Sequence, residues 1–121
     1  MTVRHYTDLI AWQKAMDLVI DVYRSTESFP RHEMFGLVNQ MRRAAVSVPS
    51  NIAEGQGRAT TKDFLHFLAV VRGSLQELQT QIILAFRLSF LDENRQQTLL
   101  GATTEVAKII NGLMNSLATD H

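Results

Sequence analysis

Apolar side chains recur at steps of three and four residues along most of this 121-residue chain. That spacing places them on one face of an α-helix, whereas a half-buried strand needs alternation at every second residue. No such alternating run occurs between turn residues, and only two prolines are present to interrupt helices. The pattern therefore predicts an all-α fold with helices at about residues 8–28, 31–57, 61–90 and 92–118.

Short connections separate these segments. Phe29-Pro30 ends the first helix, because the residue before a proline is disfavoured in the α region. Helices joined by short links pack as antiparallel neighbours, so we expect one up-down-up-down four-helix bundle over residues 1–121. Proline within a helix removes a backbone donor and crowds the preceding turn. The second helix is therefore expected to be kinked or briefly broken near Pro49.

The first helix carries two apolar stripes, which is more than one bundle core covers. We expect one of them to be the inward seam, namely Leu9, Trp12, Met16, Val19 and Tyr23. The second stripe is Ala11, Ala15, Leu18 and Val22. Because the core of one bundle can bury only one stripe, we expect the other to be buried against a second copy of the chain, and the pattern therefore predicts a homo-oligomer. The third helix has one seam, at Phe64, Leu68, Val71, Leu75, Leu78, Ile82 and Ala85.

Composition bounds the function. With 12 basic and 12 acidic residues, the formal net charge is zero, which argues against a dedicated nucleic-acid binder with a diffuse basic surface. Between Arg31 and Arg72, however, six basic residues accompany three acidic ones. A local basic face is one interpretation of this segment. The other is that these charges are only solvated, as is usual on helices.

Several classes of protein are disfavoured. The chain has no cysteine, which excludes disulfides and cysteine-based metal sites or nucleophiles and suits a reducing cytosol. The first eight residues lack the apolar core of a signal peptide. The apolar runs fall short of the roughly 20 residues that span a membrane. We expect a cytoplasmic protein with no membrane partner.

We find no catalytic constellation. Asp63 and His66 form a single acid-x-x-His step, whereas a di-iron bundle needs two Glu-x-x-His steps and further glutamates. Gly55-x-Gly57 follows a helix and lacks the Gly-Lys-Ser/Thr of a phosphate loop. No serine sits in a nucleophile elbow. The sequence predicts no catalytic residue, no metal ligand and no cofactor, hence not an enzyme.

The most unusual stretch runs from residue 40 to 58. Arg42 and Arg43 are adjacent, so they point about 100° apart on a helix, and one can face solvent while the other reaches a neighbouring helix. Glu54 and Arg58 are four residues apart and can pair. Two interpretations of these charges stay open: ion pairs within or between subunits, and phosphate binding.

The same stretch carries a family resemblance. The matching blocks are Leu9-x-x-Trp12-Gln13-x-Ala15, Phe29-Pro30-x-x-Glu33-x-Phe35-Gly36-Leu37, Gln40-x-Arg42-Arg43-Ala44-x-x-Ser47, Asn51-Ile52-Ala53-Glu54-Gly55-x-Gly57-Arg58, and Phe64-x-x-Phe67-Leu68 leading to Gly73-Ser74-x-x-Glu77. In these blocks the chain resembles the four-helix-bundle family encoded by intervening sequences in bacterial 23S ribosomal RNA genes. The resemblance implies an antiparallel bundle assembled into a ring-like homo-oligomer, a pentamer.

More distantly, the chain resembles the accessory proteins of diversity-generating retroelements, which share that ring and bind nucleic acid and a reverse transcriptase. The zero net charge of this chain departs from those more basic proteins.

Three functions follow as hypotheses. The first is a non-catalytic ring that binds structured RNA or DNA through Arg42, Arg43, Arg58 and Lys62, with salt-sensitive affinity. The second is a scaffold for a partner protein with no nucleic-acid role, and the third is an enzyme with a metal in the bundle. The expected subunit contacts are Trp12, Phe35, Asn51, Glu54 and Phe67, although the aromatic ones could equally be core residues.

Overall fold

The computed structural model of the protein describes residues 5–119. In this range four α-helices follow one another: α1 (Ile10–Thr26), α2 (Asn39–Gln56), α3 (Thr61–Arg87) and α4 (Glu93–Thr119). A 3-10 turn at Tyr6–Asp8 precedes α1, and a 3-10 turn at Arg31–Glu33 and a π-helical turn at Met34–Val38 precede α2. No strand occurs within residues 5–119. The all-α class is confirmed. The outermost residues of the predicted domain, 1–4 and 120–121, lie outside the described range.

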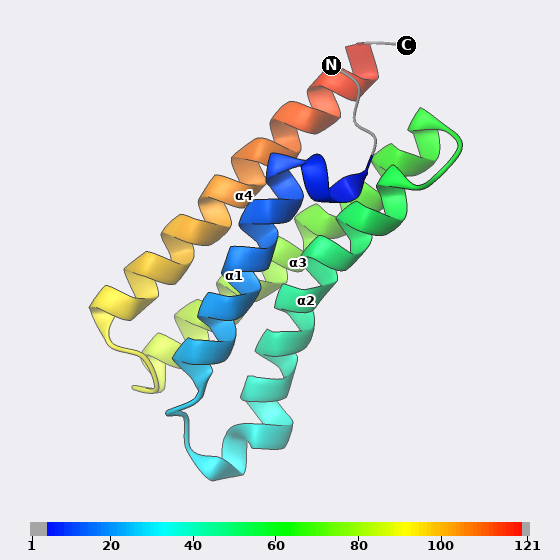
Figure 1. Ribbon diagram of the computed structural model, residues 1–121. Coiled ribbons are helices and arrows are strands. Elements are labelled where there is room, and N and C mark those ends of the chain that lie inside the picture. The colour runs from blue at the N-terminus through cyan, green and yellow to red at the C-terminus, as the bar shows by residue number, and fades with distance from the viewer. Residues whose placement is uncertain (1–4, 120–121) are drawn as a thin grey trace.

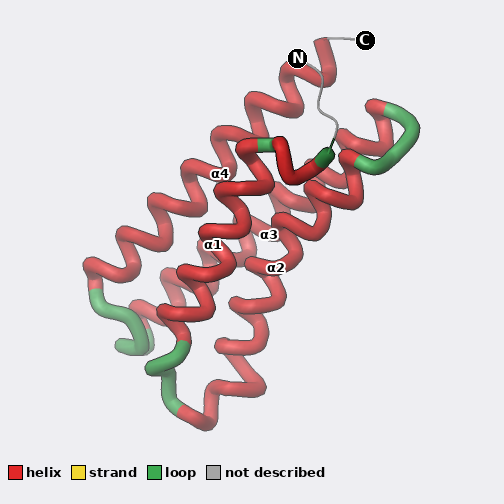
Figure 2. Tube along the Cα trace, viewed as in Figure 1, coloured by secondary structure: helices red, strands yellow, loops and turns green. Residues whose placement is uncertain are grey.

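Consecutive helices run in opposite directions (Figure 1). The loops gather at the two ends of the bundle, with the α2–α3 loop at one end and the α1–α2 and α3–α4 loops at the other (Figure 2). Helices α1 and α3 each pack against both α2 and α4. The four helices therefore enclose one core.

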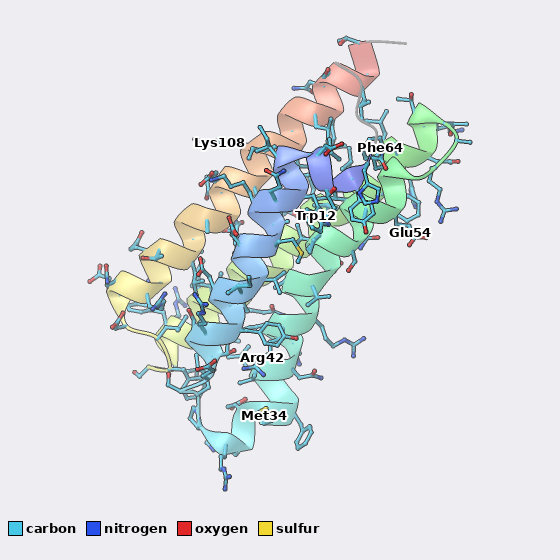
Figure 3. All side chains as sticks on the ribbon, in the orientation of Figure 1. Trp12, Met34, Arg42, Glu54, Phe64 and Lys108 are labelled. Carbon is cyan, nitrogen blue, oxygen red and sulfur yellow. The ribbon has the colours of Figure 1, made fainter. Side chains whose placement is uncertain are left out.

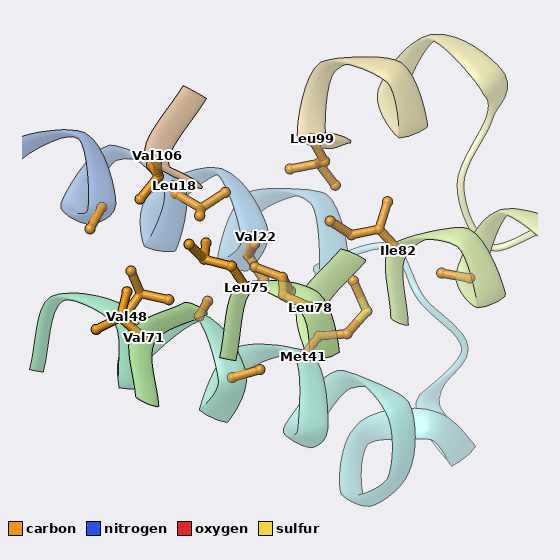
Figure 4. Packing of buried hydrophobic residues seen from close by; sticks show 14 of the residues in the cluster. Leu18, Val22, Met41, Val48, Val71, Leu75, Leu78, Ile82, Leu99 and Val106 are labelled. Atoms are coloured by element: carbon orange, nitrogen blue, oxygen red, sulfur yellow. The ribbon is translucent and has the colours of Figure 1, made fainter. Parts of the chain in front are cut away.

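That core is a single apolar cluster to which every helix contributes (Figure 4). The predicted seam of α3 is confirmed, because its residues from Leu68 to Ala85 are buried and Phe64 packs against the cluster. The largest fully buried side chains are Leu18, Met41, Ile52, Leu68, Leu75, Leu78, Ile82, Leu99 and Ile110.

The predicted inward seam of the first helix is wrong at Met16 and Tyr23, which are exposed. Leu9, Trp12 and Val19 of the same stripe are partly buried and pack against the core cluster. The fully buried stripe of α1 is Ala11, Ala15, Leu18 and Val22. The spacing of apolar residues along the sequence predicted how wide the apolar face of α1 is. It did not predict which side of that face is buried in the core.

Of the two alternatives predicted near Pro49, the short break does not occur, because α2 runs through Pro49 as one helix. The described chain leaves helical geometry earlier, at Gly36 (φ −108°, ψ −111°) within the π-helical turn. A milder kink at Pro49 stays a prediction. The third helix ends at Arg87, before the predicted residue 90, because the backbone turns left-handed at Ser89 (φ 65°).

Close contact between α2 and α3 fixes the turn that joins them. A Cβ atom on Gly55 would lie 2.7 Å from the Cβ of Phe67 and 2.9 Å from Cδ1 of Phe64. No side chain larger than a hydrogen fits there without displacing α3. The start of α3 is capped by Thr60, whose Oγ1 accepts a hydrogen bond from the Asp63 amide at 3.1 Å.

We predict that Gly55→Ala lowers the free energy of unfolding by about 1–3 kcal/mol, because the added methyl group overpacks the α2–α3 contact. Gly101→Ala is the matched control, since no atom lies within 4 Å of its added Cβ. In the interior of α4 it should raise stability by about 0.5–1 kcal/mol. Urea denaturation followed by circular dichroism measures both. Equal effects of the two substitutions would contradict the close approach at Gly55.

Candidate interaction surfaces

The two adjacent arginines of α2 have different surroundings. Nε of Arg42 donates to Thr26 Oγ1 at 3.0 Å, and its Nη2 donates to the Tyr23 carbonyl oxygen at 3.3 Å. Its guanidinium lies over the Tyr23 ring, 4.5 Å from the centroid (Figure 3). Arg43 is exposed on the outer face of α2. The prediction that one arginine reaches a neighbouring helix while the other faces solvent is confirmed.

Arg42 thereby fastens α2 to the last turn of α1. Thr26 is buried, and its hydroxyl donates to the Val22 carbonyl oxygen at 2.8 Å while accepting from Arg42. Hydrogen bonds from a charged donor are stronger than those between neutral groups. Within the chain, Arg42 holds two helices together, whereas the side chain of Arg43 is exposed.

Arg58 also has partners inside the subunit. Its Nη2 lies 2.8 Å from Glu54 Oε1, which is the predicted pair four residues apart, and its guanidinium lies 4.8 Å from the Phe67 ring centroid. Lys62 is exposed in the first turn of α3. Arg42 lies in the first turn of α2 and Arg58 follows its end at Gln56, and the 14 residues from Arg42 to Gln56 alone rise roughly 21 Å. The four predicted nucleic-acid residues therefore form two groups near opposite ends of the bundle.

Other arginines lie at the same end of the bundle as Arg42 and Arg43. This end of the bundle, where α1 and α3 finish and α2 and α4 begin, we call the arginine end; its arginines are Arg24, Arg31, Arg42, Arg43, Arg87 and Arg95. Its carboxylates are Glu27, Glu33, Asp92 and Glu93, together with Glu77, which lines the same surface hollow as Arg43, so six positive charges accompany five negative ones, a balance of +1. In the described part of the chain, none of these arginines takes part in an ion pair.

Sequence reasoning did not select Arg24, Arg87 or Arg95, because they lie far from Arg42 along the chain. The signal that could have found them was the predicted topology. In an up-down-up-down bundle the end of α1, the start of α2, the end of α3 and the start of α4 meet at one end. A count of charges by helix end, rather than along the sequence, would have brought the arginine end together.

The predicted subunit contacts fall into two kinds. Asn51 is engaged inside the subunit, where its Nδ2 donates to the Ser47 carbonyl oxygen at 2.8 Å. The Ser47 hydroxyl in turn lies 2.8 Å from that of Ser74 on α3. Glu54 and Phe67 are used in the α2–α3 turn described above. By contrast, Phe35 is 93% exposed.

Trp12 belongs to an apolar groove on the surface. Its ring meets that of Tyr6 edge-on with centroids 5.5 Å apart, and it is half-buried. The groove, of about 320 Å³, lies between α1 and α2, and we call it the α1–α2 groove; it is lined by Tyr6, Trp12, Met16, Val19, Val46, Pro49, Ser50 and Ala53. Ile20 and Tyr23 continue the exposed apolar stripe of α1 beyond it. The stripe predicted to face the core thus forms one wall of a surface groove.

The described residues hold neither a metal-binding cluster nor a membrane-spanning helix. Among residues 5–119, no three histidine, aspartate or glutamate side chains come together in a way that could hold a metal ion. Asp63 and His66 are both exposed on α3. Over the same range, no helix has the length and apolar character needed to cross a membrane.

Comparison with known proteins places the chain in a family. The sequence model of a family described as 23S rRNA-intervening sequence proteins matches residues 7–112. Among solved structures, a protein of unknown function from the S23 ribosomal protein family of Bacteroides thetaiotaomicron aligns with a TM-score of 0.78 and 17% identity. That alignment covers 87% of this chain and 98% of the other, and at such identity it shows the shared fold alone. No curated protein matches the chain.

We predict that Arg42→Met lowers the free energy of unfolding by about 1 kcal/mol, since it removes two charge-assisted hydrogen bonds and the contact with the Tyr23 ring. Arg43→Met is the matched control, because it removes the same charge from the next residue. A surface substitution of that kind should change stability by less than about 0.5 kcal/mol. Urea titration of both variants decides the matter, and a larger loss for Arg43→Met would overturn the structural role of Arg42.

Proposed function

The chain belongs to the 23S rRNA-intervening sequence protein family, and from that premise we propose that it is a non-catalytic homo-oligomer that binds structured RNA or DNA. The family match confirms the resemblance carried by the sequence blocks. The ring of five subunits that this resemblance implies, and a site of action in the cytoplasm, are part of the proposal. The distant likeness to retroelement accessory proteins stays a prediction.

The apolar surface of α1 supports self-association. Met16, Ile20 and Tyr23 are exposed on one side of the helix, beside the α1–α2 groove. Single exposed apolar residues are normal on a protein surface, whereas a contiguous group indicates an interaction site. A second copy of the chain would remove this group from water.

The arginine end is the observation that carries the nucleic-acid part of the proposal. Its arginines exceed its carboxylates by one, and none of them takes part in an ion pair in the described part of the chain. Guanidinium groups bind phosphate oxygens in a bidentate manner, independently of base sequence. Each further subunit of an oligomer would add another arginine end, so a modest local charge becomes a repeated one although the whole chain is neutral.

A second candidate function is a scaffold for a partner protein. Phe35 and the α1–α2 groove favour it, because aromatic side chains and apolar clefts dominate protein–protein contacts. Zero net charge on the chain favours it as well. We rank it second because six arginines that form no ion pair in the described part of the chain lie at one end of the bundle.

We predict that the double variant Arg43→Glu/Arg95→Glu abolishes binding of labelled structured RNA and duplex DNA at moderate salt. In wild type, affinity should fall steeply with salt, since phosphate contacts release counterions. If residual binding is measurable, the slope of log K against log[salt] on duplex DNA should be shallower by about 1.8, which is about 0.9 for each lost phosphate contact. Fluorescence anisotropy across a salt series measures both quantities.

The matched control is Arg58→Glu/Lys62→Glu, which changes the charge by the same amount near the opposite end of the bundle. It should retain most of the wild-type affinity. Light scattering on both variants checks that the oligomeric state is unchanged. Loss of binding only in the control would move the site away from the arginine end. An absence of binding by wild type at low salt would overturn the nucleic-acid role and leave the scaffold in first place.

A further inference from the structure

Phe35 protrudes from a turn that also places apolar residues in the core, and its neighbour Met34 is partly exposed beside it. Its side chain is 93% exposed, while Leu37 and Val38, in the same π-helical turn, are buried. The turn is held in place by Glu33, whose Oε1 accepts a hydrogen bond from the Leu37 amide at 3.3 Å. A fixed backbone therefore presents Phe35 to solvent as a knob.

The α1–α2 groove has the chemistry that such a knob requires. None of its lining residues is charged, and the aromatic rings of Tyr6 and Trp12 form one edge. The small residues Ser50 and Ala53 leave room on the α2 side. At about 320 Å³ the groove has the volume for an aromatic side chain.

Phe35 cannot fill the groove of its own subunit. Phe35 precedes α2, and the groove is lined by the part of α2 from Val46 to Ala53. Along this helix, Asn39 and Pro49 alone are separated by about 15 Å. Figure 3 places Met34, the neighbour of Phe35, near the opposite end of the bundle from Trp12. The knob and the groove of one chain can meet only between copies.

We propose that Phe35 of one subunit inserts into the α1–α2 groove of the next subunit, an inference that rests on the proposed homo-oligomer and names its contact surfaces. The two subunits use different surfaces, Phe35 on one and the α1–α2 groove on the other, so the interface is heterologous. Contacts of this type close into rings when the rotation between subunits allows it, and otherwise extend into filaments.

Phe35 anchors this interface but does not make up all of it. An aromatic side chain buries about 150–250 Å², whereas a stable interface buries about 800 Å² on each partner. The exposed side chains of Met16, Ile20 and Tyr23 lie along α1 beside the groove and extend the apolar surface available to the neighbouring subunit. A buried aromatic at the centre with further apolar contact around it is the usual distribution of binding energy in an interface.

Two single variants test the contact. Phe35→Asp removes the knob and leaves the groove intact, whereas Ser50→Glu places a carboxylate in the groove and leaves the knob intact. Both positions are exposed, so the fold should be retained, and circular dichroism checks this. By light scattering, each variant should drop to the mass of one 13.7 kDa chain. If Phe35→Asp impairs folding, Phe35→Ala takes its place.

Mixing the two variants is the decisive step. The knob of Ser50→Glu fits the groove of Phe35→Asp, so an equimolar mixture should give a pair of twice the single-chain mass and grow no further. An interface in which the same patch meets itself would give no such rescue. Because Trp12 is the only tryptophan of the chain and lines the groove, its emission should shift to longer wavelength in Phe35→Asp and return on mixing.

The failures can be told apart. If wild type is oligomeric and Phe35→Asp changes neither the mass nor the emission of Trp12, the knob contact is wrong and the proposed homo-oligomer stands. If wild type is a monomer at all concentrations, both are wrong, and Phe35 is left for a partner of another kind. If both variants dissociate but the mixture stays monomeric, the heterologous knob contact is overturned.

Discussion

The orientation of α1 on the core determines which side chains the rest of the molecule can display. Ala11, Ala15, Leu18 and Val22 form the face of α1 that is buried in the core. Trp12 and Met16 lie on the neighbouring face, where they form one wall of the α1–α2 groove. The same orientation brings Tyr23 to the place where Arg42 can lie over its ring.

Much of the fold could be predicted from the sequence because helix periodicity and capping are local. The seam of α3 has a single apolar stripe, and it is buried as expected. Thr60 caps α3, and Asp92 caps α4 by accepting a hydrogen bond from the Arg95 amide at 2.7 Å. The phase of α1 could not be predicted in this way. Two stripes of similar hydropathy compete there, and the choice between them depends on the size of side chains on other helices.

The candidate site was less accessible to sequence reasoning. The pairing of Glu54 with Arg58 follows from helix geometry and was foreseen, whereas the place of Asn51 and Phe67 inside the subunit depends on how α2 and α3 meet. A kink or a short break was expected near Pro49; the break does not occur there, and the described chain departs from helical geometry at Gly36. A proline inside a helix costs free energy, yet burial of that segment can offset the cost. Glycine marked the departure more accurately because it imposes no side chain on the turn.

The hydroxyl groups of Ser47 and Ser74 have a consequence for the uniqueness of the fold. Apolar contacts alone specify the axial position of one helix against another only weakly, because a shift by one turn replaces one apolar contact with another. The Ser47–Ser74 hydrogen bond joins α2 to α3 at a single axial offset, and Asn51 reinforces it at 3.0 Å from the Ser47 hydroxyl. After a slip, these half-buried polar groups would face apolar surface without partners. The pair therefore specifies the register of α2 against α3. It contributes little to the stability of their packing.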